Sequence, residues 1–128
     1  MIEKRDLKEE FLAQMGYFLT ELEKNKSLAV SGYKRGVRNV HKLAKCSRRK
    51  AHKAFSLMYA IRSACRVFLE EKPALNPDEL FEVACEVLEE ELEKINFSPE
   101  QIAAVRGVLG ELLEMTLQEF EWPSFFPY

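Results

Sequence analysis

Residues that interrupt helices are scarce in this chain, which has only five glycines and five prolines among 128 residues. No apolar run approaches the roughly 18–20 residues that span a bilayer, and no apolar signal segment follows Met1. The three cysteines, Cys46, Cys65 and Cys85, are odd in number and never spaced CxxC, which argues against a disulfide scaffold. We therefore expect a cytoplasmic protein whose cysteines are reduced, buried side chains.

Acidic residues are absent from residues 24–69, which contain thirteen Lys or Arg side chains. Residues 1–23 carry a net charge of −3, residues 24–69 carry +13 and residues 70–128 carry −12, which sum to the overall −2. The nearly neutral total therefore hides a strongly dipolar chain. A basic segment of this kind favours an anionic partner, or the acidic half of the protein itself.

Apolar residues recur at helical spacing along most of the chain, and no alternating strand pattern occurs. We predict a single all-α domain over 1–128, built as a four- or five-helix bundle. Its segments are an N-terminal helix within 1–26, a basic helical segment at 27–72, an acidic helical hairpin at 73–121 and an aromatic tail at 122–128. Asn76 before Pro77 and Ser98 before Pro99 are typical helix starts, and Gln101 completes a capping box with Ser98.

The basic segment has the most regular pattern, because apolar positions alternate at spacings of three and four from Val30 to Phe68. This unbroken phase favours one long helix over about 28–71, ended by Pro73. The alternative is two helices that break near Cys46 and Ser47, with Ser47 capping the second. A seam of this length is too long to bury within one subunit, so we expect a homo-oligomer.

Eight cations in this segment form a candidate polyanion-binding site, which we call the basic surface. They are Lys34, Arg35, Arg38, Lys42, Lys45, Arg48, Arg49 and Lys53. On a continuous helix most of them lie on one face, where like charges repel unless an anion lies outside. The leading hypothesis is a non-enzymatic protein that presents this face to DNA or RNA phosphates. A membrane partner is not expected, since the neighbouring positions lack the aromatic and leucine side chains of membrane-surface helices.

The alternative function is a self-associating protein-interaction module without a nucleic-acid role. Its acidic C-terminal half would pair with the basic surface, within or between subunits, and Glu86, Glu89, Glu90 and Glu93 share one face of the expected helix at 77–95. The last helix is expected at 99–121, where Gly107 and Gly110 permit close packing, as Gly16 does in the first helix at 3–24. Either function could involve a further protein partner.

Catalytic and cofactor sites are poorly supported by the remaining residues. His41 and His52 are eleven residues apart, about 16 Å along a helix, which is too far to share a metal ion. We therefore expect no metal and no cofactor. Arg35 and His41 have a spacing that resembles the Arg-x4–6-His pair of the helical HEPN ribonucleases, which would imply RNA cleavage as a third function, but Gly36 departs from the polar residue usual there. Cys46 has cations nearby that would favour a reactive thiolate.

Aromatic residues gather in the final segment, with Trp122, Phe125, Phe126 and Tyr128 interrupted by two prolines. The prolines prevent a helix, and exposed aromatics of this number would favour aggregation. We therefore predict that the tail docks, either on its own bundle, on a partner subunit or on another protein.

Truncation after Phe120 tests this prediction. Loss of a docked tail should lower the melting temperature by about 5 °C or more, or should reduce the assembly to a smaller species. Calorimetry and light scattering of the full-length and shortened chains measure the two effects. An unchanged melting temperature and mass would contradict docking.

Overall fold

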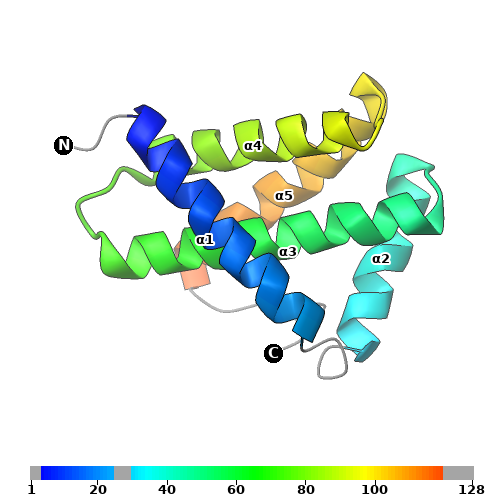
Figure 1. Ribbon diagram of the computed structural model, residues 1–128, viewed down its shortest axis with the longest axis horizontal. Coiled ribbons are helices and arrows are strands. Elements are labelled where there is room, and N and C mark those ends of the chain that lie inside the picture. Colours follow the sequence, from blue (N-terminus) through cyan, green and yellow to red (C-terminus); the bar gives the residue numbers. More distant parts are fainter. Residues whose placement is uncertain (1–3, 25–29, 120–128) are drawn as a thin grey trace.

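A central helix, α3 (Arg48–Glu71), organises the molecule. The computed structural model describes residues 4–24 and 30–119, which form five helices and no strand. α3 contacts each of the others, namely α1 (Lys4–Lys24), α2 (Val30–Ala44), α4 (Pro77–Lys94) and α5 (Pro99–Glu119). In Figure 1, α1 crosses in front of α3, α4 lies above it and α2 crosses one end. The predicted all-α bundle is confirmed.

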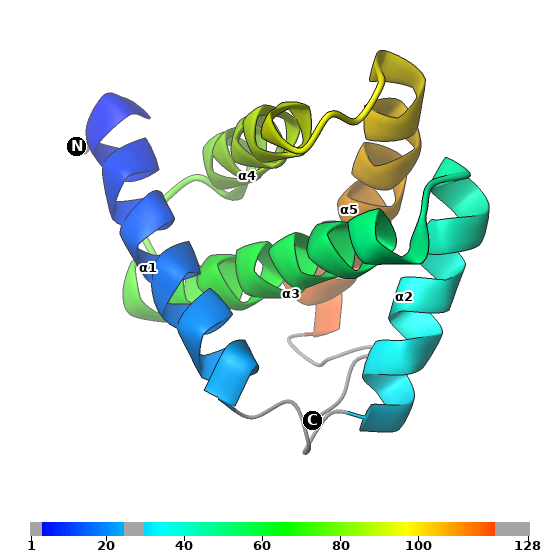
Figure 2. The same ribbon diagram turned by 45° about the vertical axis from the view of Figure 1, so that its right-hand side comes forward.

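The middle of α3 is enclosed on all sides. Residues 57–65 are buried without interruption, whereas a surface helix buries only one face. Figure 2 shows why, because α1, α4 and α5 are arranged around this stretch. Arg62 lies within it and is completely buried. Among residues 4–24 and 30–119, no helix is both long and apolar enough to cross a membrane.

Side-chain caps fix the helix starts that the sequence indicates. The Asn76 side chain accepts a hydrogen bond from the Asp78 backbone N–H at 2.9 Å. At the start of α5, the Ser98 hydroxyl accepts from the Gln101 N–H at 3.2 Å, and the Gln101 side chain accepts from the Ser98 N–H at 2.9 Å. These bonds satisfy amide donors that the first turn of a helix leaves unpaired. The predicted capping box is therefore present.

The prediction of one helix over 28–71 is wrong, and the alternative of two helices is confirmed. α2 ends at Ala44, Lys45 adopts a positive φ of 51°, and Ser47 is extended with φ −64° and ψ 159°. The Ser47 hydroxyl accepts a hydrogen bond from the Lys50 N–H at 3.2 Å and begins α3. The apolar spacing continues through the break because both helices turn their seam inward. Val40 and Ala44 of α2 and Ala54 of α3 all join the same core.

α2 and α3 pack closely at Gly36. A Cβ atom built there would overlap the ring of Phe55, whose side chain is buried. Only glycine therefore lets α2 approach α3 at this point. The same test finds open space around Gly16, Gly107 and Gly110, so the close packing expected at those glycines is not seen.

Adding a methyl group at Gly36 should therefore disturb this crossing. We expect Gly36→Ala to lower the free energy of unfolding by about 1–3 kcal/mol, since the Phe55 ring must shift within a packed core. Gly107→Ala is the matched control and should raise it by up to about 1 kcal/mol, because alanine favours the helix and meets no neighbour. Urea unfolding measures both, and equal effects would contradict a close crossing.

Candidate nucleic-acid interface

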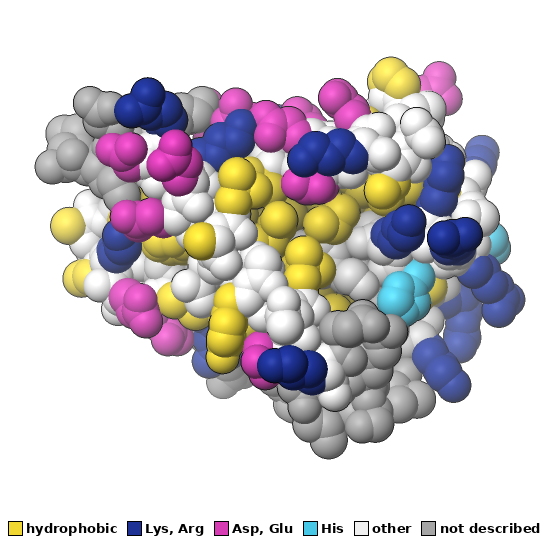
Figure 3. All heavy atoms as spheres, viewed as in Figure 1, with side chains coloured by type: hydrophobic (Ala, Val, Ile, Leu, Met, Phe, Trp, Pro, Cys, Tyr) yellow, Lys and Arg dark blue, Asp and Glu magenta, His cyan; other side chains and the backbone are white. Residues whose placement is uncertain are grey.

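The basic surface lies on two helices and the turn between them. Lys34, Arg35, Arg38 and Lys42 belong to α2, Lys45 lies in the turn, and Arg48, Arg49 and Lys53 belong to α3. All eight side chains are exposed. Because the chain bends at the turn, they form two rows that meet at one end of the molecule, rather than the single straight stripe expected. Figure 3 shows Lys and Arg gathered at this end, over α2 and the start of α3.

Acidic side chains do not neutralise this surface within the described part of the chain. None of the eight cations forms an ion pair with a residue that the structure describes. Two of the four glutamates expected to pair with them have other partners, since Glu90 binds Lys8 at 2.6 Å and Glu89 binds Arg106 at 2.7 Å. Among the described residues, pairing of the acidic half with the basic surface inside one chain is therefore not observed. Pairing between chains stays a prediction.

Helix polarity adds to the positive potential at the start of α3. Arg48, Arg49 and Lys50 occupy the first three positions of this helix, and its first turn has no acidic residue. The N-terminal end of a helix carries a partial positive charge, so cations there are unfavourable by about 0.3–1 kcal/mol each. Lys50 is partly relieved, because it donates to the Asn96 carbonyl at 3.1 Å. An anion bound near Arg48 and Arg49 would offset their unfavourable interaction with the N-terminal end of α3.

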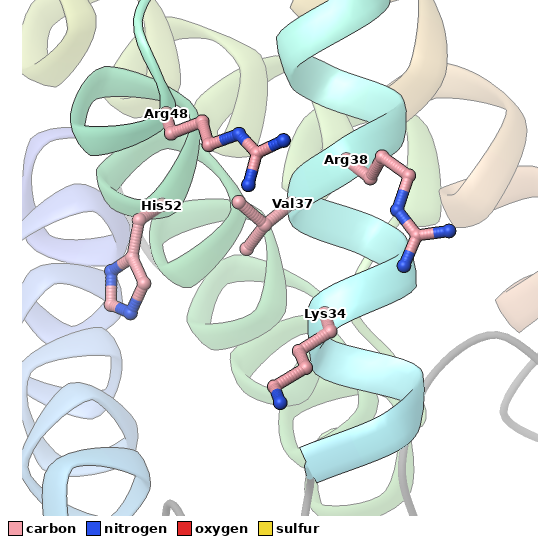
Figure 4. A pocket seen from close by; sticks show the side chains of 5 residues that line it. All are labelled: Lys34, Val37, Arg38, Arg48 and His52. Atoms are coloured by element: carbon pink, nitrogen blue, oxygen red, sulfur yellow. The ribbon is translucent and has the colours of Figure 1, made fainter.

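A cavity of about 340 Å³ opens within the basic surface, between α2 and α3. It is lined by Lys34, Val37, Arg38, Arg48 and His52. In Figure 4, Arg48 extends from the first turn of α3 toward α2, and Lys34 extends from α2 into the same gap. Val37 lies between them, His52 lies on the α3 side, and Arg38 lies farther round α2. Three of the eight predicted cations, Lys34, Arg38 and Arg48, thus belong to the lining of this cavity.

The predicted site residues do not include Val37 or His52, although His52 falls within the basic stripe that the sequence predicts. Val37 belongs to the apolar seam and reads as a core residue, although it is only partly buried. His52 is one helical turn after Arg48, which places both on one face of α3. That spacing is the only signal that linked His52 to the site, and it does not reveal the cavity, since the cavity depends on where α2 crosses.

His41 has a structural role in the turn. Its Nδ1 donates a hydrogen bond to the Cys46 carbonyl oxygen at 2.5 Å, which ties the end of α2 to the segment that begins α3. Arg35 is six residues earlier, so the two side chains are about 120° apart around the helix axis. Among the described residues, no group of three or more potential ligands could hold a metal ion.

The cysteines are buried to different degrees and form no disulfide. Burial raises the pKa of the Cys46 thiol, although its backbone hydrogen bond and the nearby Lys50 act in the opposite direction. Burial also raises the pKa of Cys65 and Cys85, the latter against the influence of Arg106. The cations near Cys46 therefore do not produce the reactive thiolate that its sequence context favours.

Thiol labelling tests this conclusion. The thiolate is the reactive form, so a raised pKa keeps each native thiol protonated and slow below that pKa, and rates should rise as pH increases toward it. With Ellman's reagent at pH 8, half-buried Cys85 should react first and fully buried Cys65 last. All three should react promptly in guanidinium. Rapid native labelling of Cys46 would contradict its burial, and mass spectrometry of the labelled peptides identifies each site.

The predicted docking residues Trp122, Phe125, Phe126 and Tyr128 lie outside the described residues, so tail docking stays a prediction. Comparison with known proteins finds no matching family model, no matching curated protein and no matching solved structure. The functional argument therefore rests on the residues and geometry described above.

Proposed function

We propose that this protein binds the phosphate backbone of DNA or RNA through the basic surface on α2 and α3. One observation carries the proposal, namely eight exposed cations from two helices and a turn that form no ion pair with a described residue. Lysine and arginine side chains that neutralise phosphates release condensed counterions, which drives binding. The function proposed is binding alone, without a catalytic step or cofactor.

The extent of the surface supports a polymeric anion rather than a single small one. From Lys34 to Lys42, α2 rises about 12 Å. A nucleic-acid duplex presents about seven phosphate charges over that length. Lys45, Arg49 and Lys53 extend the positive surface beyond α2, so several phosphates can be contacted at once.

Self-association is the alternative proposal, but the fold makes the apolar seam less suitable as the contact between subunits. Most of the described part of the seam that was expected to need a partner is buried within the chain, since residues such as Val40, Ala54 and Met58 join one core. An oligomer would instead depend on contacts between the basic surface and acidic residues of a second copy. A cytoplasmic location is proposed on the free cysteines, which suit a reducing compartment.

Salt-dependent binding provides the test. We expect random-sequence DNA and RNA to bind at about 50 mM NaCl, with affinity falling on the order of a thousandfold at 200 mM, as for six or more phosphate contacts. Replacing Arg38, Lys42, Lys45 and Arg49 by Gln should lower the slope of log affinity against log salt by about three to four. Fluorescence anisotropy measures both.

A matched control variant distinguishes binding through the basic surface from a general effect of the protein's net charge. Replacing the exposed Arg5, Lys24 and Lys94 and the partly exposed Arg66 by Gln changes the net charge equally, yet leaves the basic surface intact. This control should retain the original slope. Equal weakening by both variants, or no binding by the original protein at 50 mM salt, would exclude the proposal. Loss of assembly in the first variant, measured by light scattering, would favour self-association.

A further inference from the structure

The cavity between α2 and α3 combines an apolar floor with a cationic rim. Among the described residues that line it, Val37 is the one apolar side chain, while Lys34, Arg38 and Arg48 bring charge to its edge and His52 an imidazole ring. Its volume of about 340 Å³ is at the small end of the range for ligand pockets. A phosphate alone would leave Val37 without a partner, and a purely apolar ligand would leave the cations without one. The lining fits a ligand that has a flat apolar part and an anionic part.

We propose that this cavity receives one unstacked nucleotide of a single-stranded nucleic acid. The inference rests on the proposed function, because it places the cavity on the same phosphate-binding surface. The base would lie over Val37 with the planar Arg48 guanidinium against its face, an arrangement that guanidinium groups commonly adopt with bases. Lys34 and Arg38 would contact the phosphates on either side.

The geometry of the cavity favours single-stranded over double-stranded nucleic acid. A base within a duplex is stacked and paired, and entering a cavity between two helices requires it to leave the stack at a cost of a few kcal/mol. Single strands, loops and ends expose bases without that cost. The remaining cations contact phosphate in either form. The cavity therefore confers a preference for single strands on a surface that otherwise binds any nucleic acid.

A mononucleotide titration tests the cavity by itself. Adenosine 5′-monophosphate, added to about 10 mM, should shift the Val37 methyl resonances and the His52 ring resonances in NMR spectra, as expected for weak millimolar binding. Inorganic phosphate and adenosine, tested separately at the same concentration, should shift them less. No shift with the nucleotide, or an equal shift with phosphate alone, would overturn the proposal.

Two single variants with the same change in charge test the preference for single-stranded over duplex oligonucleotides. Arg48→Ala removes a cation from the cavity, whereas Arg35→Ala removes an exposed cation that does not line it. For a 12-nucleotide single strand, Arg48→Ala should weaken binding about tenfold and Arg35→Ala about threefold, since base stacking adds to charge at the first position only. For a 12-base-pair duplex, the two variants should differ little.

The outcomes distinguish this inference from the proposed function. If both oligonucleotides bind the original protein but the two variants weaken single-strand binding equally, the nucleotide cavity is excluded and backbone binding remains. If neither oligonucleotide binds at about 50 mM salt, the proposed function itself fails. Circular dichroism of each variant confirms that the helices are retained.

Discussion

The contact between Gly36 of α2 and the ring of Phe55 in α3 determines where the basic surface lies. Phe55 is anchored in the core, so the helix that crosses it has little freedom to move. At this crossing the outer face of α2 carries its cations to the same end of the molecule as the first turn of α3. A wider separation would open the space beside Val37, and a different crossing point would separate Lys34 from Arg48. The cavity and the arrangement of the cations therefore both depend on the glycine at position 36.

Acidic and basic charges are divided between different parts of the fold, and the division follows the packing of α3. α1, α4 and α5 surround its middle, and two of the ion pairs among the described residues link these outer helices, Lys8 with Glu90 and Arg106 with Glu89. α2 contacts α3 and α5 instead. Because α4 is not among its main partners, the acidic face of α4 is kept away from the cations of α2. A dipolar sequence thus becomes a dipolar surface.

The sequence predicts the helices well because their starts are chemically marked. Asn76 and Ser98 cap as expected, and the seam residues from Val40 to Phe68, apart from Ser47, enter the core. The break at Lys45 could not be predicted from the spacing of apolar residues. The three residues between α2 and α3 keep the same spacing that one continuous helix would show. Ser47 was the only local mark of the break. The cavity was beyond prediction, because it arises from a tertiary crossing, and neither Val37 nor His52 differs locally from residues that merely pack.

The clustered cations reduce stability, and the central helix explains how the fold tolerates this. Like charges on α2 repel, and Arg48 and Arg49 oppose the dipole of α3, each by a few tenths of a kcal/mol to about 1 kcal/mol. Seven of the nine consecutive buried positions 57–65 in α3 are apolar, and their burial offsets such a cost. In the proposed complex, attraction between these cations and the phosphates would offset the repulsion between the cations. The same clustered cations thus lower the stability of the free protein and favour the binding of an anion.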